Sequence, residues 1–548
     1  MEFCSTKIIV CDMGKKINNY PILWIIALIS LFFCGTVNYL NEPAYHWLSA
    51  SSIKFTNNWL NDGIVADKFA MLEQPASIES PTIQDRHPYV SYPNGVVMLC
   101  YSVAKLFGYQ QIDMNFIKPL SIVIFLLDAL MIGLLIYLIL NYVFKYQSRC
   151  KTIILSVFLS CLWICLPNNV FFLKNVFFAD QLVLFFIYLF LVLEVLRNFV
   201  PIIKPGIRLF INCLLFICIF LGILIEYYFW IQVFVVILIH FIHSLTKKEK
   251  FLYNLKNLLI YIIPSVLAIV VFLFQIIQID HWMDTLITKF TERTGQSSVI
   301  SENYLLRIGY SIYKAYKAIG LLLLAASGGV LIYLISGIRK RKLQSDIHSP
   351  VLLFSFIAIL PVLIQLLVFM NHSAIHEFSI IKLGFPFIFG ILLITYYFSY
   401  YKKKSTDYFF SITILVITAY LFYIHGNTSY FYDKRLSIDD KSLQLKGFEP
   451  IVEELNDYNN VFFSFTDSIP DNPPLSIAVT KKKIYKIYTE SDIKSKFPNL
   501  NSNAKVLILM NKYVEKDEQT LHNEQKALEQ AILIKETEKY AVYQLNSQ

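Results

Sequence analysis

The sequence predicts an α-helical polytopic membrane protein of about eleven transmembrane helices, followed by a small C-terminal α/β domain. Of the 548 residues, 56% are hydrophobic and only 16% are charged, which is typical of chains that cross a membrane many times. Apolar segments of about 20 residues recur up to residue 425. Short clusters of Lys and Arg separate them on one side only, as the positive-inside rule expects.

The predicted spans alternate between the two faces of the membrane. Lys7, Lys15 and Lys16 precede the first span and place the N-terminus inside. The apolar run 209–243 is too long for one crossing, so we divide it at an outer turn that carries Glu226. In order, the spans are residues 20–40, 120–143, 152–167, 181–196, two within 209–243, 258–279, 319–338, 351–370, 380–400 and 409–425. Every strong basic cluster then lies inside.

The first outer loop, residues 41–119, is polar and aromatic and begins beside a carboxylate, Glu42. Its last third contains VVMLCYSVAKLFG, an apolar stretch of about a dozen residues that suits a helix lying in the membrane interface better than one crossing it. A later outer loop places Trp282, Leu286 and Phe290 near one helical face, which predicts a second interfacial helix.

The composition changes at about residue 426, which predicts two domains: a transmembrane domain over 1–425 and a soluble extracytoplasmic α/β domain over 426–548. In the second, FEPIVEELNDY is typical of a helix. VFFSF, LSIAV and KVLILM are typical of short strands, and ILIKETEKYAVYQL of a closing hairpin. No cysteine follows Cys218, so no disulfide framework supports this domain. No glycine-rich nucleotide loop is present, and the net charge of +9 resides in the basic clusters, so no nucleic-acid partner is predicted.

Several short motifs lie in order on the predicted outer side of the chain. They are Asn41-Glu42, Asn61-Asp62-Gly63, Tyr92-Pro93-Asn94-Gly95, Leu106-Phe107-Gly108, Asp180, and His376 followed by Pro386 within a span. Over about residues 20–400 this order resembles the integral-membrane glycosyltransferases of the GT-C fold, in the branch of the protein O-mannosyltransferases and lipid A aminoarabinose transferases. Two positions depart from that branch: Asn41 stands where Asp is usual, and Tyr92 stands where the aminoarabinose transferases have Lys.

The resemblance implies transfer of a sugar from a polyprenyl-phosphate donor to a lipid, glycan or protein acceptor on the outer face of a bacterial-type cytoplasmic membrane. Such a reaction needs a carboxylate to accept the acceptor's proton and cations to stabilise the departing lipid phosphate. It also needs an apolar groove among the spans, within the membrane lipids, for the polyprenyl chain. No cofactor is implied, and dependence on a divalent metal stays open.

Two carboxylates are the predicted catalytic residues: Glu42 as the base and Asp180 as the second acidic residue of the site. Each has a simpler alternative. Glu42 precedes Pro43 and could be the negative charge at a helix start. Asp180 could cap the fourth span.

The predicted contacts to donor phosphate are cationic or hydrogen-bonding side chains in the outer loops. They are Arg86, His87, Tyr92, Arg293 and His376. Asp85, Glu226 and His372 are additional candidates for the site, with Asp85 as the alternative base and Glu226 as a further carboxylate. For residues 85–87 the alternative is a solvated loop, and for Glu226 a simple turn. His372 and His376 have the spacing of two metal ligands on a helix, but no further ligand set is evident, so no metal site is predicted.

Three other functions compete with transfer. A lipid-linked oligosaccharide polymerase or ligase would also place its site on outer loops. A transporter or flippase of lipid-linked sugars would concentrate polar residues near mid-membrane, where Asp128 is the clear carboxylate. A membrane scaffold would leave the first outer loop without an explanation. The gathering of carboxylates at outer span ends favours the enzyme.

Overall fold

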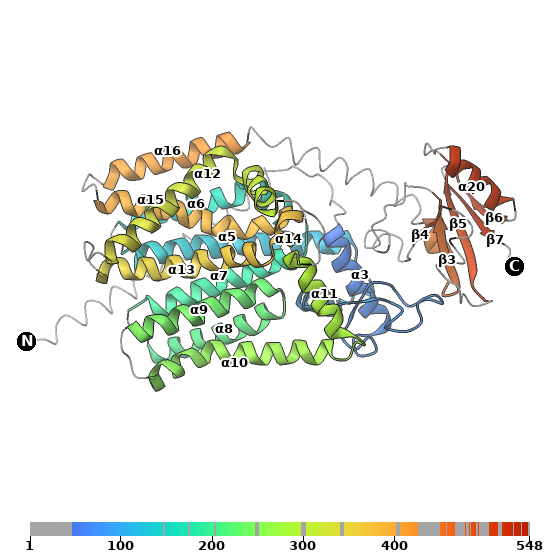
Figure 1. The fold of residues 1–548 in the computed structure, drawn as a ribbon, viewed down its shortest axis with the longest axis horizontal. Coiled ribbons are helices and arrows are strands. Elements are labelled where there is room, and N and C mark those ends of the chain that lie inside the picture. Colours follow the sequence, from blue (N-terminus) through green and yellow to red (C-terminus); the bar gives the residue numbers. More distant parts are fainter. Residues whose placement is uncertain are drawn as a thin grey trace, which may run out of the picture.

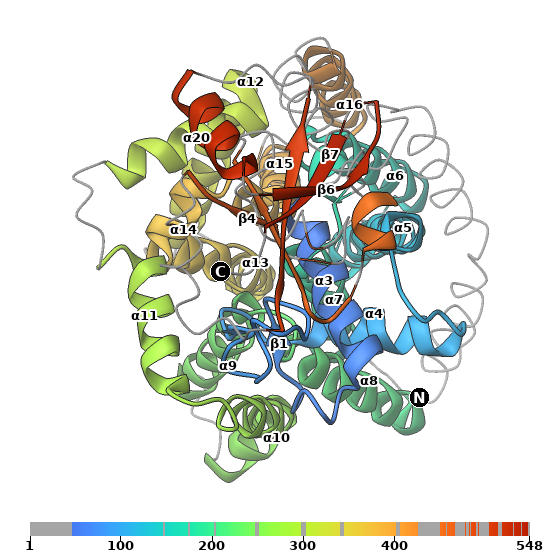
Figure 2. The ribbon, with the colours of Figure 1, turned by 90° about the vertical axis from the view of Figure 1, so that its right-hand side faces the viewer.

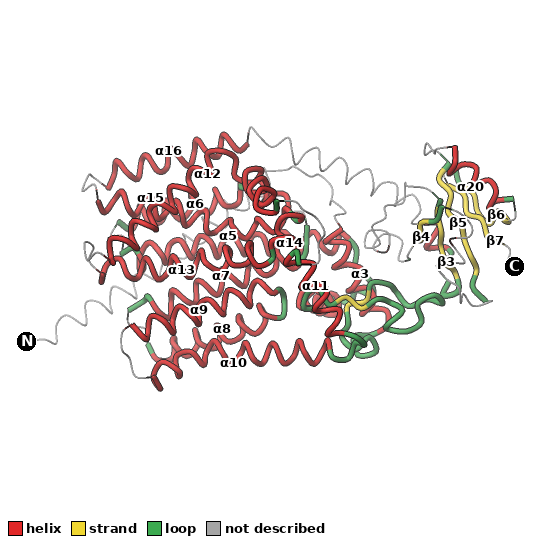
Figure 3. The backbone as a smooth tube through the Cα atoms, viewed as in Figure 1, coloured by secondary structure: helices red, strands yellow, loops and turns green. Residues whose placement is uncertain are grey.

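The computed structural model describes residues 47–145, 148–173, 176–201, 204–246, 251–296, 303–339, 345–401 and 406–425, together with parts of 450–545. The described chain forms a bundle of long helices with a smaller sheet at one end (Figures 1 and 3). Eight helical segments within these residues are long and apolar enough to cross a membrane. The predicted class, a polytopic helical protein with a small C-terminal sheet region, is confirmed.

The bundle follows the predicted order of spans. Its helices are α5 (Met114–Leu138) with the π-helical extension η1 (Ile139–Val143), α6 (Arg149–Cys165), α7 (Ala179–Asn198), α8 (Pro205–Ile223), α9 (Tyr227–Thr246), α10 (Phe251–Ile276), α12 (Tyr304–Arg339), α13 (Ser345–Val368), α15 (Gly384–Tyr401) and α16 (Thr406–His425). The predicted first span, 20–40, lies outside the described residues.

Several boundaries differ from the prediction, among them those of α5, α12 and the stretch 371–378. Helix α5 begins earlier than residue 120 because the Asp113 side chain caps it by accepting a hydrogen bond from Phe116 N at 3.1 Å. Helix α12 also begins earlier, at Tyr304, and Lys317 breaks it with φ 56° and ψ −177°. The stretch 371–378, predicted as a loop, is mostly helical: it forms most of α14 (Met370–Ile375) and the start of the 3₁₀ helix η3 (Glu377–Leu383).

The centre of the bundle is formed by α7 and by the η3–α15 segment. In the most apolar stretch of Glu377–Phe398, 94% of the residues are buried, and in that of Ala179–Asn198, 72% are buried. In the most apolar stretch of Tyr304–Ile338, only 22% are buried. Helix α12 is therefore peripheral and exposes an apolar face, which is the arrangement expected where lipid replaces protein as the neighbour.

The first outer loop packs against one end of this bundle. It contains α3 (Trp47–Asp62), the short strands β1 (Met71–Leu72) and β2 (Pro88–Tyr89), and α4 (Gly95–Leu106). The predicted helix in VVMLCYSVAKLFG is α4, and the one predicted around residues 282–290 is α11 (Trp282–Thr294). The loop and α11 lie at the same end of the bundle (Figures 1 and 2).

Close backbone contacts fix the first loop to two turns between bundle helices. Gly95 N donates to Leu224 O at 2.8 Å, and a Cβ at Gly95 would lie only 2.5 Å from that oxygen, so this position requires glycine. Ser49 Oγ accepts from Phe177 N at 3.0 Å, and Ser52 Oγ donates to Phe177 O at 3.2 Å. The loop is therefore held to the turn before α7 and to the turn between α8 and α9.

The C-terminal region forms a five-stranded mixed sheet in the order β4-β3-β5-β7-β6. The strands are β3 (Asn460–Ser464), β4 (Ile484–Lys486), β5 (Lys505–Asn511), β6 (Ala531–Glu536) and β7 (Tyr540–Leu545), with helix α20 (Glu518–Leu528). Strand β3 runs parallel to β4 and β5, whereas β7 is antiparallel to β5 and β6. The strands predicted in VFFSF and KVLILM and the closing hairpin are confirmed; LSIAV lies almost wholly outside the described residues.

The sheet contacts the first loop. Tyr485 Oη donates to Gln74 Oε1 at 3.1 Å, and Ile78 N donates to Tyr458 O at 3.1 Å. Figure 2 shows the sheet in front of the bundle end that carries α3 and α11. We call this the loop end. The opposite end, where Lys145, Arg149 and Arg208 lie near helix termini, is called the basic end.

Candidate active site

A buried ion-pair cluster lies at the loop end of the bundle. Asp180 is in the first turn of α7, Glu226 is in the turn between α8 and α9, and Lys382 is near the end of η3. Lys382 Nζ lies 2.5 Å from Asp180 Oδ1 and 3.4 Å from Glu226 Oε2, and no side chain of the three is more than 4% exposed. Three segments far apart in sequence thus meet at one amine.

The cluster holds two carboxylates for one cation. Burial raises the pKa of Glu226, against the opposing charge of Lys382, and the nearby Asp180 raises it further. Tyr228 N donates to Glu226 Oε2 at 2.9 Å. Asp180 Oδ1 and Lys382 Nζ touch, but within the described chain neither atom makes a well-aligned hydrogen bond. Both atoms can therefore still form hydrogen bonds. Buried polar groups in folded proteins rarely lack a hydrogen-bond partner.

A second cluster of donors and rings lies beside the first. The guanidinium of Arg293 stands over the ring of Tyr92 at 4.2 Å and over that of Tyr227 at 5.7 Å. Tyr92 Oη is 3.3 Å from His372 Nε2, and the rings of His372 and His376 are 4.6 Å apart. The charge of Arg293 also lowers the pKa of Glu226, so the two clusters interact electrostatically.

The protonation of this second cluster suits binding of an anion. Burial, reinforced by His376 and the cations Arg293 and Lys382, holds the pKa of His372 well below its usual range. His372 is therefore neutral near pH 7 and presents one N–H donor. In the described part of the chain, no carboxylate lies within ion-pairing distance of Arg293, so its charge is balanced only by ring faces and by longer-range interactions.

The structure brings together six of the predicted site residues and places Asp85, Arg86 and His87 apart from them. The first group is Asp180, Glu226, Tyr92, Arg293, His372 and His376. Asp85 and His87 are exposed instead: Asp85 accepts from Thr82 Oγ1 at 2.5 Å, and His87 occupies a turn with φ 51°. Glu42 lies outside the described residues.

Arg86, predicted to contact phosphate, has carboxylate partners within its own loop. Its guanidinium donates to Asp67 Oδ1 at 2.9 Å and to Asp62 Oδ2 at 2.6 Å, and its Nε donates to Gln74 O at 2.9 Å. Arg86 is only 4% exposed. These contacts assign it to folding of the first loop.

Arg86→Gln should therefore lower thermal stability, because breaking a buried ion pair costs about 3–5 kcal/mol. Burial raises the pKa of Asp67 to about 6 even beside Arg86. Below that pH Asp67 takes up a proton and no longer needs the cation, so the loss should shrink as pH falls. Thermal unfolding of the detergent-solubilised protein at several pH values measures this. The double variant Arg86→Gln/Asp67→Asn should recover part of the loss, and equal unfolding midpoints for wild type and Arg86→Gln would contradict the assignment.

Lys382 is the site residue that sequence reasoning missed. It lies in SIIKLGFPF, inside the stretch predicted as the tenth span. A lysine inside an apolar segment is costly and normally faces a partner within the bundle. The position of this lysine within an apolar segment is visible in the sequence, but its two partners are not, because Asp180 and Glu226 lie in other segments.

No group of three or more His, Cys, Asp and Glu side chains in the described ranges is arranged to hold a metal ion.

No family model matches the chain, and no curated protein sequence matches it. Solved structures do match. The chain is similar to ArnT from Cupriavidus metallidurans bound to undecaprenyl phosphate, with a TM-score of 0.54 and 11% identity over 96% of this chain and 98% of that one. It is also similar to the archaeal oligosaccharyltransferase AglB from Archaeoglobus fulgidus in complex with an inhibitory peptide and a dolichol-phosphate, with a TM-score of 0.53 and 12% identity over 91% and 70% of the two chains.

The chain has the GT-C fold. The resemblance expected from the order of the outer-loop motifs is confirmed at the level of fold, and the structural match extends beyond residues 20–400 to most of the chain. Within this GT-C protein the two clusters occupy the end where the first loop covers the bundle.

Proposed function

We propose that this GT-C protein is a membrane glycosyltransferase that moves a sugar from a polyprenyl-phosphate donor to an acceptor on the outer face of the membrane. The observation that carries the proposal is the pairing of a buried carboxylate–lysine cluster with an adjacent cluster of anion-binding donors, Arg293, Tyr92 and His372. Two proteins of similar fold were solved with undecaprenyl phosphate and with a dolichol-phosphate, which supports the class of donor.

The chemistry assigns separate tasks to the two clusters. The acceptor oxygen attacks C1 of the sugar, the bond from C1 to the phosphate oxygen breaks, and the polyprenyl phosphate leaves with the bonding electron pair. Arg293, with no carboxylate partner in the described chain, would bind the departing phosphate together with the N–H of His372 and the hydroxyl of Tyr92. These donors are fixed by packing before the reaction begins.

The carboxylates would act on the acceptor side of the bond. Glu42 is proposed as the base that takes the acceptor's proton, with Asp180 orienting the acceptor hydroxyl. Lys382 would hold Asp180 in place and keep it ionised beside Glu226. Its raised pKa makes Glu226 the weaker candidate for a negatively charged role at neutral pH.

The orientation belongs to the same proposal. Basic residues gather at the end opposite the two clusters, and the positive-inside rule would put that end in the cytoplasm. The candidate site and the C-terminal sheet would then face outward, in a multi-pass cytoplasmic-membrane protein. Outward sites do not meet nucleotide sugars, which agrees with the absence of a nucleotide-binding glycine motif in the sequence.

Purified protein in proteoliposomes should consume a polyprenyl-phosphate sugar from a panel of such donors and should be inactive with the corresponding nucleotide sugars alone. Membranes of a host that lacks the protein supply the acceptors, and mass spectrometry of the labelled product identifies both sugar and acceptor. Turnover of a nucleotide sugar without a lipid-linked intermediate would refute the donor class.

The orientation in the membrane is tested in intact cells. A cysteine placed at exposed Glu518 on the C-terminal helix should react with a membrane-impermeant thiol reagent from outside intact cells, whereas one at Lys145 should not. Labelling of Lys145→Cys alone would reverse the orientation and, with it, the face on which transfer is proposed.

A further inference from the structure

A cavity lies between α8 and α10 at the basic end of the bundle, apart from the candidate site. Its volume is about 550 Å³. Its lining residues are Arg197, Arg208, Asn212, Phe216, Asn257, Leu259, Ile260 and Ile263. Arg208 lies in the first turn of α8, whereas Glu226 follows the other end of that helix, so roughly 22 Å of helix separates Arg208 from the carboxylate cluster.

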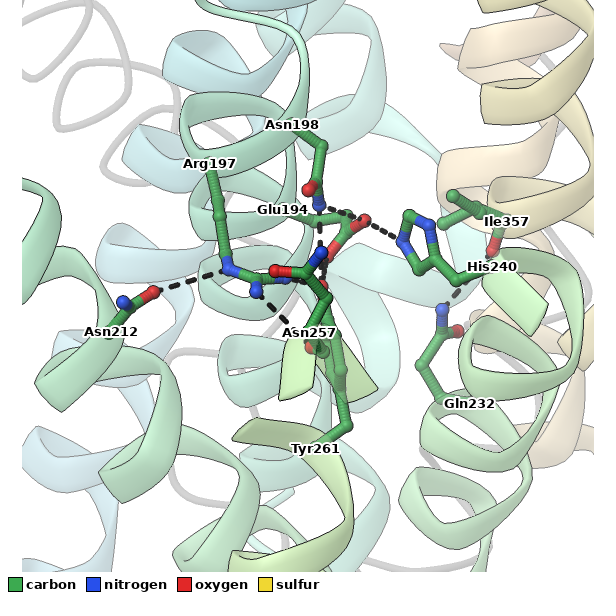
Figure 4. A network of polar contacts seen from close by, with 9 residues as sticks. All are labelled: Glu194, Arg197, Asn198, Asn212, Gln232, His240, Asn257, Tyr261 and Ile357. Carbon is green, nitrogen blue, oxygen red and sulfur yellow. Dashed lines mark hydrogen bonds and ion pairs between the residues drawn. The ribbon is translucent and has the colours of Figure 1, made fainter. Parts of the chain in front are cut away.

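The inner wall of the cavity is a fixed polar network (Figure 4). Arg197 Nε donates to Asn212 Oδ1 at 3.2 Å, and its two terminal nitrogens donate to Tyr261 Oη at 2.8 Å and to Asn257 O at 3.2 Å. Three helices, α7, α8 and α10, are joined by this one guanidinium. These hydrogen bonds tie the wall together, and Asn212 and Asn257 line the cavity.

The charge of Arg197 is already compensated within the protein. Glu194, one helical turn earlier, accepts from Tyr261 Oη at 2.6 Å and from Asn198 Nδ2 at 2.6 Å, and it lies 2.5 Å from His240 Nε2. Tyr261 connects the two charged groups (Figure 4). The inner wall thus contributes hydrogen bonds to the cavity but little net charge.

Arg208 is different because its charge is uncompensated. Its side chain is exposed, and within the described residues it has no ion-pair partner. Phe216 and Ile260 continue the cavity along the helices, and Leu259 and Ile263 are 39% and 46% exposed at its edge. The cavity therefore has a cationic mouth and an apolar side that opens toward the space lipid chains would fill.

We propose that this cavity binds one anionic phospholipid of the membrane leaflet that covers the basic end. The headgroup phosphate would pair with Arg208 and accept from the amide of Asn212, and one acyl chain would follow the apolar side past Phe216 and Ile263. Basic pockets between transmembrane helices on the cytoplasmic side recognise anionic headgroups in this way. A net negative lipid is favoured over a zwitterionic one because the mouth carries a single positive charge with no counterion from the described part of the protein.

Native mass spectrometry of the full-length protein, titrated in detergent with phosphatidylglycerol or with phosphatidylcholine of matched chains, tests this. Wild type should bind phosphatidylglycerol more tightly. Arg208→Gln should weaken that binding about tenfold, the value expected for loss of one charge-assisted hydrogen bond, while Arg208→Lys should retain most of it. Ile260→Trp, which fills the apolar side, should weaken binding of both lipids.

Lys145→Gln is the matched control, since it removes one exposed cation from the same end of the bundle outside the cavity. It should leave phosphatidylglycerol binding unchanged. Equal affinity of wild type for the two lipids, an unaltered affinity in Arg208→Gln, or an equal loss in Lys145→Gln would each overturn the proposal. None of these outcomes depends on the enzymatic activity.

Discussion

Lys382→Met should reduce sugar transfer by at least about 10²-fold, the usual cost of removing one preorganised charged or hydrogen-bonding group from a reaction centre. Methionine keeps the length and apolar stem of lysine but removes the cation between Asp180 and Glu226. The two carboxylates then face each other in a buried site, which displaces Asp180 or protonates one of the pair. The transfer assay in proteoliposomes, normalised to folded protein by size-exclusion chromatography, measures the effect.

The same substitution should also destabilise the protein, since it leaves buried carboxylates without a partner at a cost of about 3–5 kcal/mol. The double variant Lys382→Met/Glu226→Gln separates the two effects because it restores the net charge of the cluster. It should recover stability but not transfer. Lys289→Met, at a half-exposed pair with Glu292, is the matched control and should retain activity. Near-normal transfer by the double variant would show that Lys382 has only a structural role.

Glu42→Gln should leave the protein folded and inserted but lower turnover by about 10²–10⁴-fold, the usual contribution of a general base. Glutamine preserves the size and hydrogen-bonding reach of the side chain and removes only the ability to take a proton. Single-turnover measurement of transfer with saturating donor isolates this step from donor binding.

Two further variants test which carboxylate is the general base. Asn41→Asp places an acid where the glycosyltransferase branch that the motifs resemble usually has one, and it should rescue part of the activity of Glu42→Gln. Asp85→Asn should have little effect on transfer, because Asp85 is exposed and hydrogen-bonded to Thr82. If Glu42→Gln turns over at a near-normal rate while Asp180→Asn does not, the role of base belongs to Asp180.

The spans, their order and the first outer loop could be predicted from the sequence because they depend on local properties. The segment 181–196 is apolar for long enough to cross a membrane, and α7 covers it. VVMLCYSVAKLFG is apolar but short, and α4 forms there. Basic clusters beside helix ends are visible in the sequence whatever the helices pack against.

The sequence by itself determined which segments form the long apolar helices and which end of the bundle is basic. It also determined that Asp180, Glu226, Tyr92, Arg293 and the two histidines lie near the other end. Which charges meet there was decided only by the tertiary structure. Arg86 and Lys382 illustrate the difference. Arg86 was expected to contact phosphate but pairs with two carboxylates close in sequence, whereas Lys382, inside a predicted span, pairs with Asp180 and Glu226. Ion pairs and hydrogen bonds form only when side chains come within a few ångströms of each other. Tyr92 and His372, which are 280 positions apart in the sequence, come that close only when the helices pack.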